Sequence, residues 1–261
     1  MTTANDISNR IIEAVMAQKL APGSRLGEQQ LAMLFDCSRT VVREALTRLS
    51  TRGIVTVSAR RGWFVVEPSQ DEAREAFEAR RVIELGLLHQ LRSVDKAAVR
   101  QLKSHLQREK AALAGADVGA RSFLLGDFHV CLAECLGNAL LADTLRDFTA
   151  RTTLIAMLYQ SSHDAAQSCD DHVRIVEALE AGDIARAEAL MSEHIGTVQS
   201  ALRPQASSDP LAGLRDALAP VHKGPAQGPV PARRPRSRST PAASTDDASS
   251  SDASTYLGAL L

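Results

Sequence analysis

Apolar residues recur every three or four positions along most of the chain, and this spacing places them on one face of an α-helix. From residue 71 the period continues, with short breaks, to about residue 202. It predicts six helices, at about 71–91, 95–113, 119–136, 138–161, 165–181 and 183–202. Aspartates are expected to cap three of them, at Asp95, Asp164 and Asp183. Because no strand pattern interrupts this region, the sequence predicts an all-helical bundle.

The first 67 residues follow a different pattern. One helix is expected to begin at Asp6, its cap, and a second helix to cover residues 28–35. Only two residues separate the second helix from a third that begins at Ser38, so these helices meet at a tight corner. Two β-rich runs, 54–57 and 63–66, flank a loop with glycine and two arginines. The sequence therefore predicts a mainly α protein whose N-terminal part is a winged helix-turn-helix with a small β-hairpin wing.

The helix that begins at Ser38 has two chemically different faces. The apolar positions fall in one arc: Val41, Val42, Ala45, Leu46 and Leu49. The opposite arc carries two guanidinium groups, three hydroxyls and no acid: Arg39, Thr40, Arg43, Thr47 and Ser50. Guanidinium groups suit phosphate oxygens and the major-groove edge of guanine, and hydroxyls bond to either phosphate or base. Alone, the pattern also fits a basic surface helix, but the tight corner and the basic wing favour a helix that reads DNA.

The candidate DNA contacts come from the second helix, the reading helix and the wing. They are Gln29, Ser38, Arg39, Thr40, Arg43, Thr47, Arg60, Arg61 and Gly62. The net charge of −1 is unevenly spread, because residues 1–67 hold nine basic and six acidic side chains, whereas residues 68–203 hold fifteen and twenty. A basic N-terminal part on an acidic body indicates a protein that contacts DNA, as its partner, through the first part alone.

The cysteine spacing and the lack of apolar segments exclude a metal finger and a secreted or membrane protein, and the C-terminal residues have a composition of their own. Four cysteines (Cys37, Cys131, Cys135 and Cys169) lack the spacing of a metal finger, and the sequence has no secretion signal or long apolar run. We therefore expect a reduced, cytoplasmic protein without a membrane partner. Residues 204–261 are rich in Pro, Ala, Ser and Asp and are predicted to be a disordered tail. The arginine-rich stretch at 233–238 leaves weak phosphate contact as its alternative role.

Polar residues also occur on the inward stripes of the predicted bundle. Three histidines lie on three different helices, so their imidazoles are expected to meet in the core: His129, His172 and His194. One such histidine is more often a satisfied core residue, but three can share a site, because imidazole binds Zn²⁺ and related ions. Arg80 and Arg151 also point inward on this pattern, and a buried guanidinium needs a partner. The spacing leaves open whether Glu84 or a ligand carboxylate supplies it.

Three N-terminal segments carry a family resemblance. They read PGSRLGEQQLA at 22–32, SRTVVREAL at 38–46 and RGWFV at 61–65. Together they resemble the winged helix-turn-helix of GntR-family bacterial transcription regulators. One departure is Val41, where that family often has proline; the position lies in the first turn of the helix, where a backbone N–H is dispensable.

The bundle also resembles a known domain. The stretch EARRVIE at 78–84, the Phe128-His129 pair, and the segment from Asp171-His172 to His194 are similar to the FCD effector domain of the FadR subfamily. The resemblance implies that His129, His172 and His194, with an aspartate one turn before the Phe-His pair, bind a divalent metal such as zinc, and that a small carboxylate completes its coordination. Here that position is Leu125, which cannot bind a metal. Either three ligands hold zinc with an open fourth position, or the histidines bind the effector without a metal.

These observations predict a regulator with three parts: a DNA-binding domain at 1–67, an effector-binding and dimerisation domain at 70–203, and the tail at 204–261. The expected function is ligand-responsive transcriptional control, with repression as the default, by a homodimer on a pseudo-palindromic operator. The family resemblance implies a small organic acid as the effector, bound by Arg80, Arg151 and the three histidines, and the missing aspartate leaves open an uncharged or nitrogen-rich ligand. A metal-dependent hydrolase and an architectural DNA-binding protein are the alternatives. A hydrolase would leave residues 1–67 unexplained, so no catalytic residue is assigned. An architectural protein would have an apolar core, which does not agree with the inward polar residues.

Overall fold

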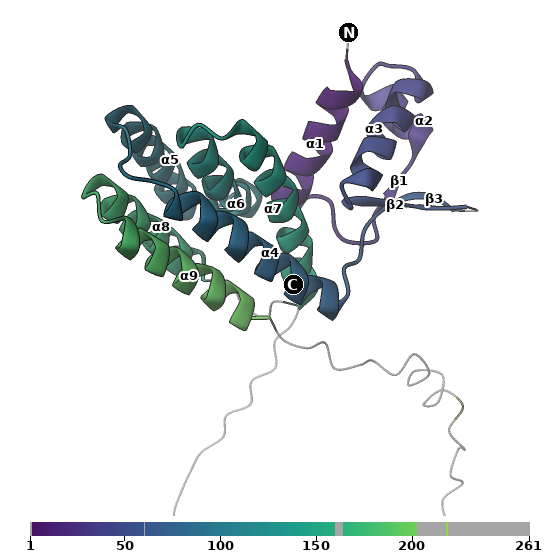
Figure 1. Ribbon diagram of the computed structural model, residues 1–261. Coiled ribbons are helices and arrows are strands. Elements are labelled where there is room, and N and C mark those ends of the chain that lie inside the picture. The colour runs from purple at the N-terminus through teal and green to yellow at the C-terminus, as the bar shows by residue number, and fades with distance from the viewer. Residues whose placement is uncertain (1, 60, 160–163, 203–217, 219–261) are drawn as a thin grey trace, which may run out of the picture. The chain divides into compact units, whose positions relative to one another are not determined.

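A computed structural model describes residues 2–59, 61–159, 164–202 and 218 (Figure 1). The fold is mainly helical, and the described residues from 2 to 202 belong to one compact unit. The predicted tail, apart from Leu218, lies outside the described residues, as do Arg60 and Arg203. None of the described helices is long and apolar enough to cross a membrane.

The N-terminal part, residues 2–67, is called the head. Its elements are α1 (Ala4–Met16), β1 (Arg25–Leu26), α2 (Glu28–Leu34), α3 (Arg39–Thr51), β2 (Val55–Ser58) and β3 (Gly62–Val65). The predicted helix-turn-helix and hairpin are both present. The strands form an antiparallel sheet in the order β1-β3-β2, with Arg25 opposite Phe64 and Val57 opposite Trp63. The two-residue strand β1 was not predicted, because a run this short has no periodicity.

The cap of α1 differs from the prediction. Thr3, and not Asp6, is the cap: its hydroxyl accepts a hydrogen bond from the Asp6 amide at 3.2 Å. The Asp6 carboxylate in turn accepts from the Thr3 amide at 2.8 Å. This reciprocal capping box moves the cap, and with it the start of the helix, three residues toward the N-terminus. The expected cap of α3 is confirmed, since the Ser38 hydroxyl accepts from the Val41 amide at 3.4 Å.

The C-terminal part is a bundle of helices (Figure 1). They are α4 (Gln70–His89), α5 (Lys96–Ala114), α6 (Val118–Cys135), α7 (Ala139–Tyr159), α8 (Ala165–Glu180) and α9 (Ile184–Ser200). The predicted boundaries are correct to within a few residues, and the aspartate caps of α5, α8 and α9 are confirmed. Within the bundle, α5 packs on α6 and α8, and α4 packs on α7 and α9. The core is filled by apolar side chains such as Phe77, Phe128, Leu132, Ile175 and Met191.

Helix α7 belongs to the bundle and to the head core at the same time. Ala150 and Leu154 of α7 are fully buried in the apolar cluster that contains Ile12 of α1 and Leu46 of α3. Helix α1 accordingly contacts both α6 and α7. The head therefore shares its hydrophobic core with one helix of the bundle.

This shared core gives a stability prediction. Replacing the buried Leu154 with alanine leaves a cavity, so Leu154→Ala should lower the free energy of unfolding by about 2–5 kcal/mol. The matched control is Leu140→Ala on the same helix, which is 78% exposed and should change this free energy by less than about 0.5 kcal/mol. Urea denaturation followed by circular dichroism measures both. Equal effects of the two substitutions would contradict the shared core.

Candidate functional site

The reading helix α3 turns its apolar face inward and its basic face to solvent. Its inner side chains are buried, as predicted: Val42, Ala45, Leu46 and Leu49. Arg39, Thr40, Arg43 and Thr47 are exposed on the other side. The side chains that the sequence predicted for contact with phosphates and bases are therefore accessible together on one helix face.

An acid that the sequence interpretation missed lies beside this face. The carboxylate of Glu28, in the first turn of α2, accepts hydrogen bonds from Arg43 Nε at 3.0 Å and Arg43 Nη2 at 2.7 Å. It also accepts from Arg39 Nη2 at 3.1 Å and from the indole Nε1 of Trp63 on β3 at 3.1 Å. These bonds, those from Arg43 foremost, lower the pKa of Glu28 to about 2. One carboxylate thus connects Arg39 and Arg43, the two arginines on the basic face of α3, to the wing.

The remaining predicted contacts have mixed placements. Gln29, Arg61 and Gly62 line the same surface hollow as Arg39 and Arg43, which has a volume of about 720 Å³. By contrast, the hydroxyl groups of Ser38 and Thr47 are already engaged with backbone atoms of α3, as the cap and as a donor to the Arg43 carbonyl at 2.8 Å. The loop arginine Arg60 lies outside the described residues.

Removal of the Glu28 charge tests this arrangement. Glu28→Gln should weaken binding to a selected operator by about tenfold, because the guanidinium groups lose the charged oxygen pair that orients them and keep a single neutral acceptor. Binding to random DNA should become tighter, since a negative charge beside the phosphates is lost. Glu44→Gln is the control, because Glu44 is exposed on α3 and pairs with Arg48. Fluorescence anisotropy with both DNAs gives the ratio of operator affinity to random-DNA affinity. If Glu28→Gln leaves this ratio unchanged, Glu28 does not position the arginines.

Inside the bundle, the three predicted histidines come together. His129 on α6, His172 on α8 and His194 on α9 are all buried. One nitrogen from each lies within 4.8 Å of the others, and the Nε2 atoms of His172 and His194 are 3.3 Å apart. The expectation that these imidazoles meet in the core is confirmed by this geometry.

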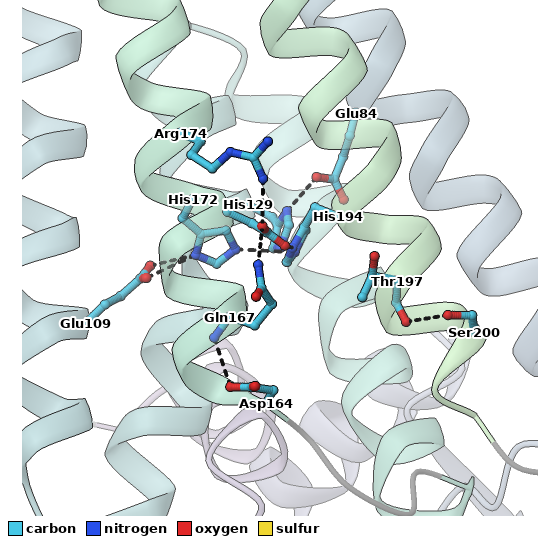
Figure 2. A network of polar contacts seen from close by, with 11 residues as sticks. Glu84, Glu109, His129, Asp164, Gln167, His172, Arg174, His194, Thr197 and Ser200 are labelled. Atoms are coloured by element: carbon cyan, nitrogen blue, oxygen red, sulfur yellow. Dashed lines mark hydrogen bonds and ion pairs between the residues drawn. The ribbon is translucent and has the colours of Figure 1, made fainter.

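Each imidazole has a carboxylate behind it. Figure 2 shows His129 facing Glu84 of α4 and His172 facing Glu109 of α5. The Nδ1 atom of His129 lies 2.5 Å from Glu84, and that of His172 lies 3.0 Å from Glu109. His194 Nδ1 lies 3.3 Å from Asp171 of α8. An ionised carboxylate can only accept, so each Nδ1 carries the proton and each Nε2 offers a lone pair. Two facing lone pairs at 3.3 Å favour a cation between them, and carboxylate-backed histidines are the usual ligands of zinc. The donor set fits a divalent metal.

Electrostatics keep the histidines ready to bind. Burial lowers the pKa of His129 to about 3, although Glu84 opposes the shift, and burial also lowers the pKa of His194. Burial alone would raise the pKa of the Glu84 carboxyl, but His129 and Arg80 outweigh it and hold that pKa well below its usual value. Two of the three imidazoles are therefore neutral at pH 7 and need not lose a proton to bind a metal.

The two arginines that were expected to point inward have different hydrogen-bond partners. Arg80 is buried; its Nε donates to Glu84 at 2.8 Å and its Nη1 to the Thr152 hydroxyl at 3.0 Å. Glu84 is therefore its partner. The expectation that Arg151 points toward the histidines is wrong: its Nη2 donates to the carbonyl of Arg52 at 2.8 Å, at the end of α3. The reason is that α7 turns one side to the bundle and another to the head.

The histidines open into a small cavity of about 90 Å³, called the histidine cavity. Arg80, Leu125 and Thr149 also line it, and no acid lies among its lining residues in the described part of the chain. The buried Thr149 hydroxyl has no hydrogen-bond partner among the described residues. This volume is far below the roughly 300–1,000 Å³ of drug-sized sites, so the cavity suits an ion with a small ligand.

Other residues around the site were assigned less well from the sequence. His105, to which the sequence analysis assigned no role, is buried, with its Nε2 3.2 Å from Glu109 and 3.0 Å from the Leu124 carbonyl. The signal was the i,i+4 spacing of His105 and Glu109 on one helix. Cys131 and Cys135 lie beside each other, with sulfur atoms 3.9 Å apart, and neither lines the cavity.

Replacing Leu125 tests whether this set is a weakened metal site. Leu125→Asp adds a fourth ligand at the cavity wall and should raise Zn²⁺ affinity by about tenfold or more. Leu125→Asn, of the same size and without charge, is the control. Isothermal titration calorimetry with ZnCl₂ on protein stripped with chelator gives the affinities. Zn²⁺ binding that is the same in all three proteins would show that metal does not bind at this wall.

A winged helix-turn-helix joined to a helical domain with a buried polar cavity defines a DNA-binding regulator with room for a small ligand. Comparison with known families agrees: the model "Bacterial regulatory proteins, gntR family" matches residues 3–65, and the model "FCD domain" matches residues 75–197. The chain belongs to the GntR family of transcription regulators, in the group with an FCD domain. It is a transcription regulator and not an enzyme, which excludes the hydrolase alternative.

Curated relatives are likewise named as transcriptional regulators, and solved structures share the fold. The chain is 27% identical to the regulator LutR of Bacillus subtilis over 70% of this chain and 94% of that protein. It is 25% identical to the transcriptional repressor RspR of Escherichia coli over 70% and 82% of the two chains. A GntR regulator from Rhodococcus sp. RHA1 shares the fold, with a TM-score of 0.65 and 22% identity over 76% of this chain and 95% of that chain. The E. coli protein McbR/YncC does so with a TM-score of 0.67 and 18% identity, over the same shares.

Proposed function

We propose that this protein is a repressor that binds its operator as a homodimer and releases it when a small organic acid binds in the histidine cavity. The observation that carries the proposal is the convergence of three carboxylate-backed imidazoles beside the buried Arg80. Names of relatives support the direction, since they include the repressor RspR and a "Probable D-xylose utilization operon transcriptional repressor" of Paenarthrobacter nicotinovorans.

The DNA-binding part is proposed to be residues 1–67, with α3 in the major groove and the wing at the backbone. Arg39, Thr40 and Arg43 would contact bases and phosphates, with Gln29, Arg61 and Gly62 at the edges of the contact. A symmetric dimer presents two such helices, and it therefore suits a pseudo-palindromic operator. Such a protein acts where bacterial DNA lies, in the cytoplasm.

The effector part is proposed to be residues 70–203, which would also form the dimer. His129, His172 and His194 would hold a divalent metal such as zinc, and the metal would supply a cationic anchor for a carboxylate. Glu84, Glu109 and Asp171 lie behind the imidazoles, and no acid lines the cavity itself in the described part of the chain, so a carboxylate ligand would meet no like charge at the cavity surface. The free Thr149 hydroxyl offers that ligand a further donor. A bundle that only dimerises, as in an architectural protein, would have no use for these buried polar groups.

Two variants separate the two activities. Arg43→Ala should weaken operator binding by about 1–3 kcal/mol without changing Zn²⁺ affinity, because it removes a base-contacting guanidinium. His172→Ala should abolish tight Zn²⁺ binding and leave operator binding intact. His89→Ala is the control, since that side chain is 81% exposed on α4. The operator is selected from random DNA, and native mass spectrometry of the three proteins reports dimer mass and bound metal.

The outcomes are distinct. If His172→Ala retains the Zn²⁺ affinity of the wild type, the cavity is not the metal site. If Arg43→Ala retains operator affinity, α3 is not the reading helix. If His172→Ala unfolds, His172→Gln replaces it, because glutamine keeps a polar side chain of similar volume at this position. The comparison of Zn²⁺ and operator binding is then repeated.

A further inference from the structure

A residue of the DNA-binding head forms part of the wall of the histidine cavity. Gln18, just after α1, lines this cavity, whereas the other lining residues lie between Phe77 and Val198. Gln18 is exposed, while the histidines at the other side are buried. It therefore lies where a ligand anchored on the histidines would meet solvent.

The backbone holds Gln18 in place. Its φ of 55° is left-handed, a conformation that only Asp36 shares among the described non-glycine residues. Two hydrogen bonds at the end of α1 fix this turn, from the Gln18 amide to the Val15 carbonyl and from the Lys19 amide to the Ala14 carbonyl, each at 2.8 Å. A strained conformation persists only where surrounding contacts determine it. The position of Gln18 is thus set by the head.

The end of α1 is also attached to the cavity wall. The hydroxyl of Ser122 on α6 donates to the Met16 carbonyl at 2.9 Å, and Ser122 lines the cavity. Gly126 lines it one turn further on, and a Cβ at Gly126 would lie 3.4 Å from Met16 Cε and 2.8 Å from Thr149 Cγ2. A shift of α6 at this wall would therefore also move the end of α1.

The reading helix has a second link to the same wall. Thr149 and Thr152 of α7 line the cavity. On the neighbouring turns, Asp147 accepts from Arg52 Nε at 2.8 Å, and Arg151 donates to the Arg52 carbonyl. Arg52 is the C-terminal cap of α3. One helix of the cavity wall is in this way bonded to the end of the helix that faces DNA.

We propose that the side-chain amide of Gln18 contacts the effector directly, so that a ligand in the cavity touches the head as well as the bundle. The inference rests on the proposed function, in which a small carboxylic acid binds at the histidines. Two other donors at the wall are in use, because Ser122 bonds to Met16 and Arg80 bonds to Glu84, while the Thr149 hydroxyl, like the Gln18 amide, has no partner among the described residues. No described residue hydrogen-bonds to the Gln18 side chain, so its amide N–H groups are available to a carboxylate oxygen. A ligand with this contact would bind more tightly when the head holds Gln18 at the cavity than when it does not, and such a difference in affinity is what coupling between the cavity and DNA requires.

Two variants of the full-length protein test the contact. Gln18→Asn keeps an amide and tolerates the left-handed backbone but shortens the side chain by one methylene, and Gln18→Gly removes the side chain and relieves the backbone strain. Lys19→Ala is the matched control, because Lys19 is the adjacent exposed residue and does not line the cavity. Calorimetry uses the Zn²⁺-loaded proteins with L-lactate, L-malate and citrate as probes.

The acid that binds the wild type most tightly should bind both Gln18 variants about tenfold more weakly, the cost of one hydrogen bond to a carboxylate. Zn²⁺ affinity should not change, because Gln18 is not a ligand. The single tryptophan, Trp63, lies in the wing and gives a second readout. Addition of the acid should change its fluorescence in the wild type and in Lys19→Ala, and change it less in the Gln18 variants.

Failure of this inference differs from failure of the proposed function. If the acid binds the wild type and the Gln18 variants equally well, and Trp63 responds equally, Gln18 does not contact the effector and the organic-acid function stands. If none of the acids binds the Zn²⁺-loaded wild type, the organic-acid effector and the Gln18 contact are both wrong.

Discussion

The pairing of three buried imidazoles with three carboxylates is the constraint on which the bundle depends. A buried polar group that lacks a partner costs several times what its hydrogen bond contributes, so every member of this cluster must be in register with another helix. Glu84 of α4 and Glu109 of α5 reach His129 of α6 and His172 of α8, and Asp171 of α8 reaches His194 of α9. The pairs thereby fix the rotation of five helices about their axes. An apolar core of the same volume would give equal or greater stability, so the cluster is better explained by binding than by folding.

Much of this architecture could be predicted from the sequence, because it follows from local periodicity. The helix boundaries, the aspartate caps and the burial of one face of α3 all depend on residues within one or two turns of each other. The convergence of His129, His172 and His194 was predictable for the same reason, since each lies on the apolar stripe of its own helix. A helix that buries one stripe leaves few directions in which its inward polar residues can point.

The errors at the candidate sites come from contacts between residues far apart in the chain, whereas the shift of the α1 cap from Asp6 to Thr3 is a local effect. Glu28 is absent from the basic face of α3 in sequence, yet it lies against Arg43 because α2 and α3 meet at the corner of the helix-turn-helix. Arg151 lies on a helix with two buried sides, and periodicity alone does not say which side faces the bundle and which the head. Glu109 shares a helix with His105, but nothing local identifies His172 as its second partner. A helix with two packing partners is the case in which an inward stripe is ambiguous.

Helix α7, which packs on both the head and the bundle, links the DNA-binding part to the histidine cavity. Helix α7 contributes Ala150 and Leu154 to the core of the head and Thr149 and Thr152 to the histidine cavity. Packed interiors do not deform continuously, so a change of side-chain position on one side of such a helix is resisted on the other. In a bundle attached to its head by a flexible linker alone, a ligand would alter only its own surroundings. Here the histidine cavity and the core beneath the reading helix lie on two sides of α7, so ligand binding in the cavity can be coupled energetically to the position of the reading helix.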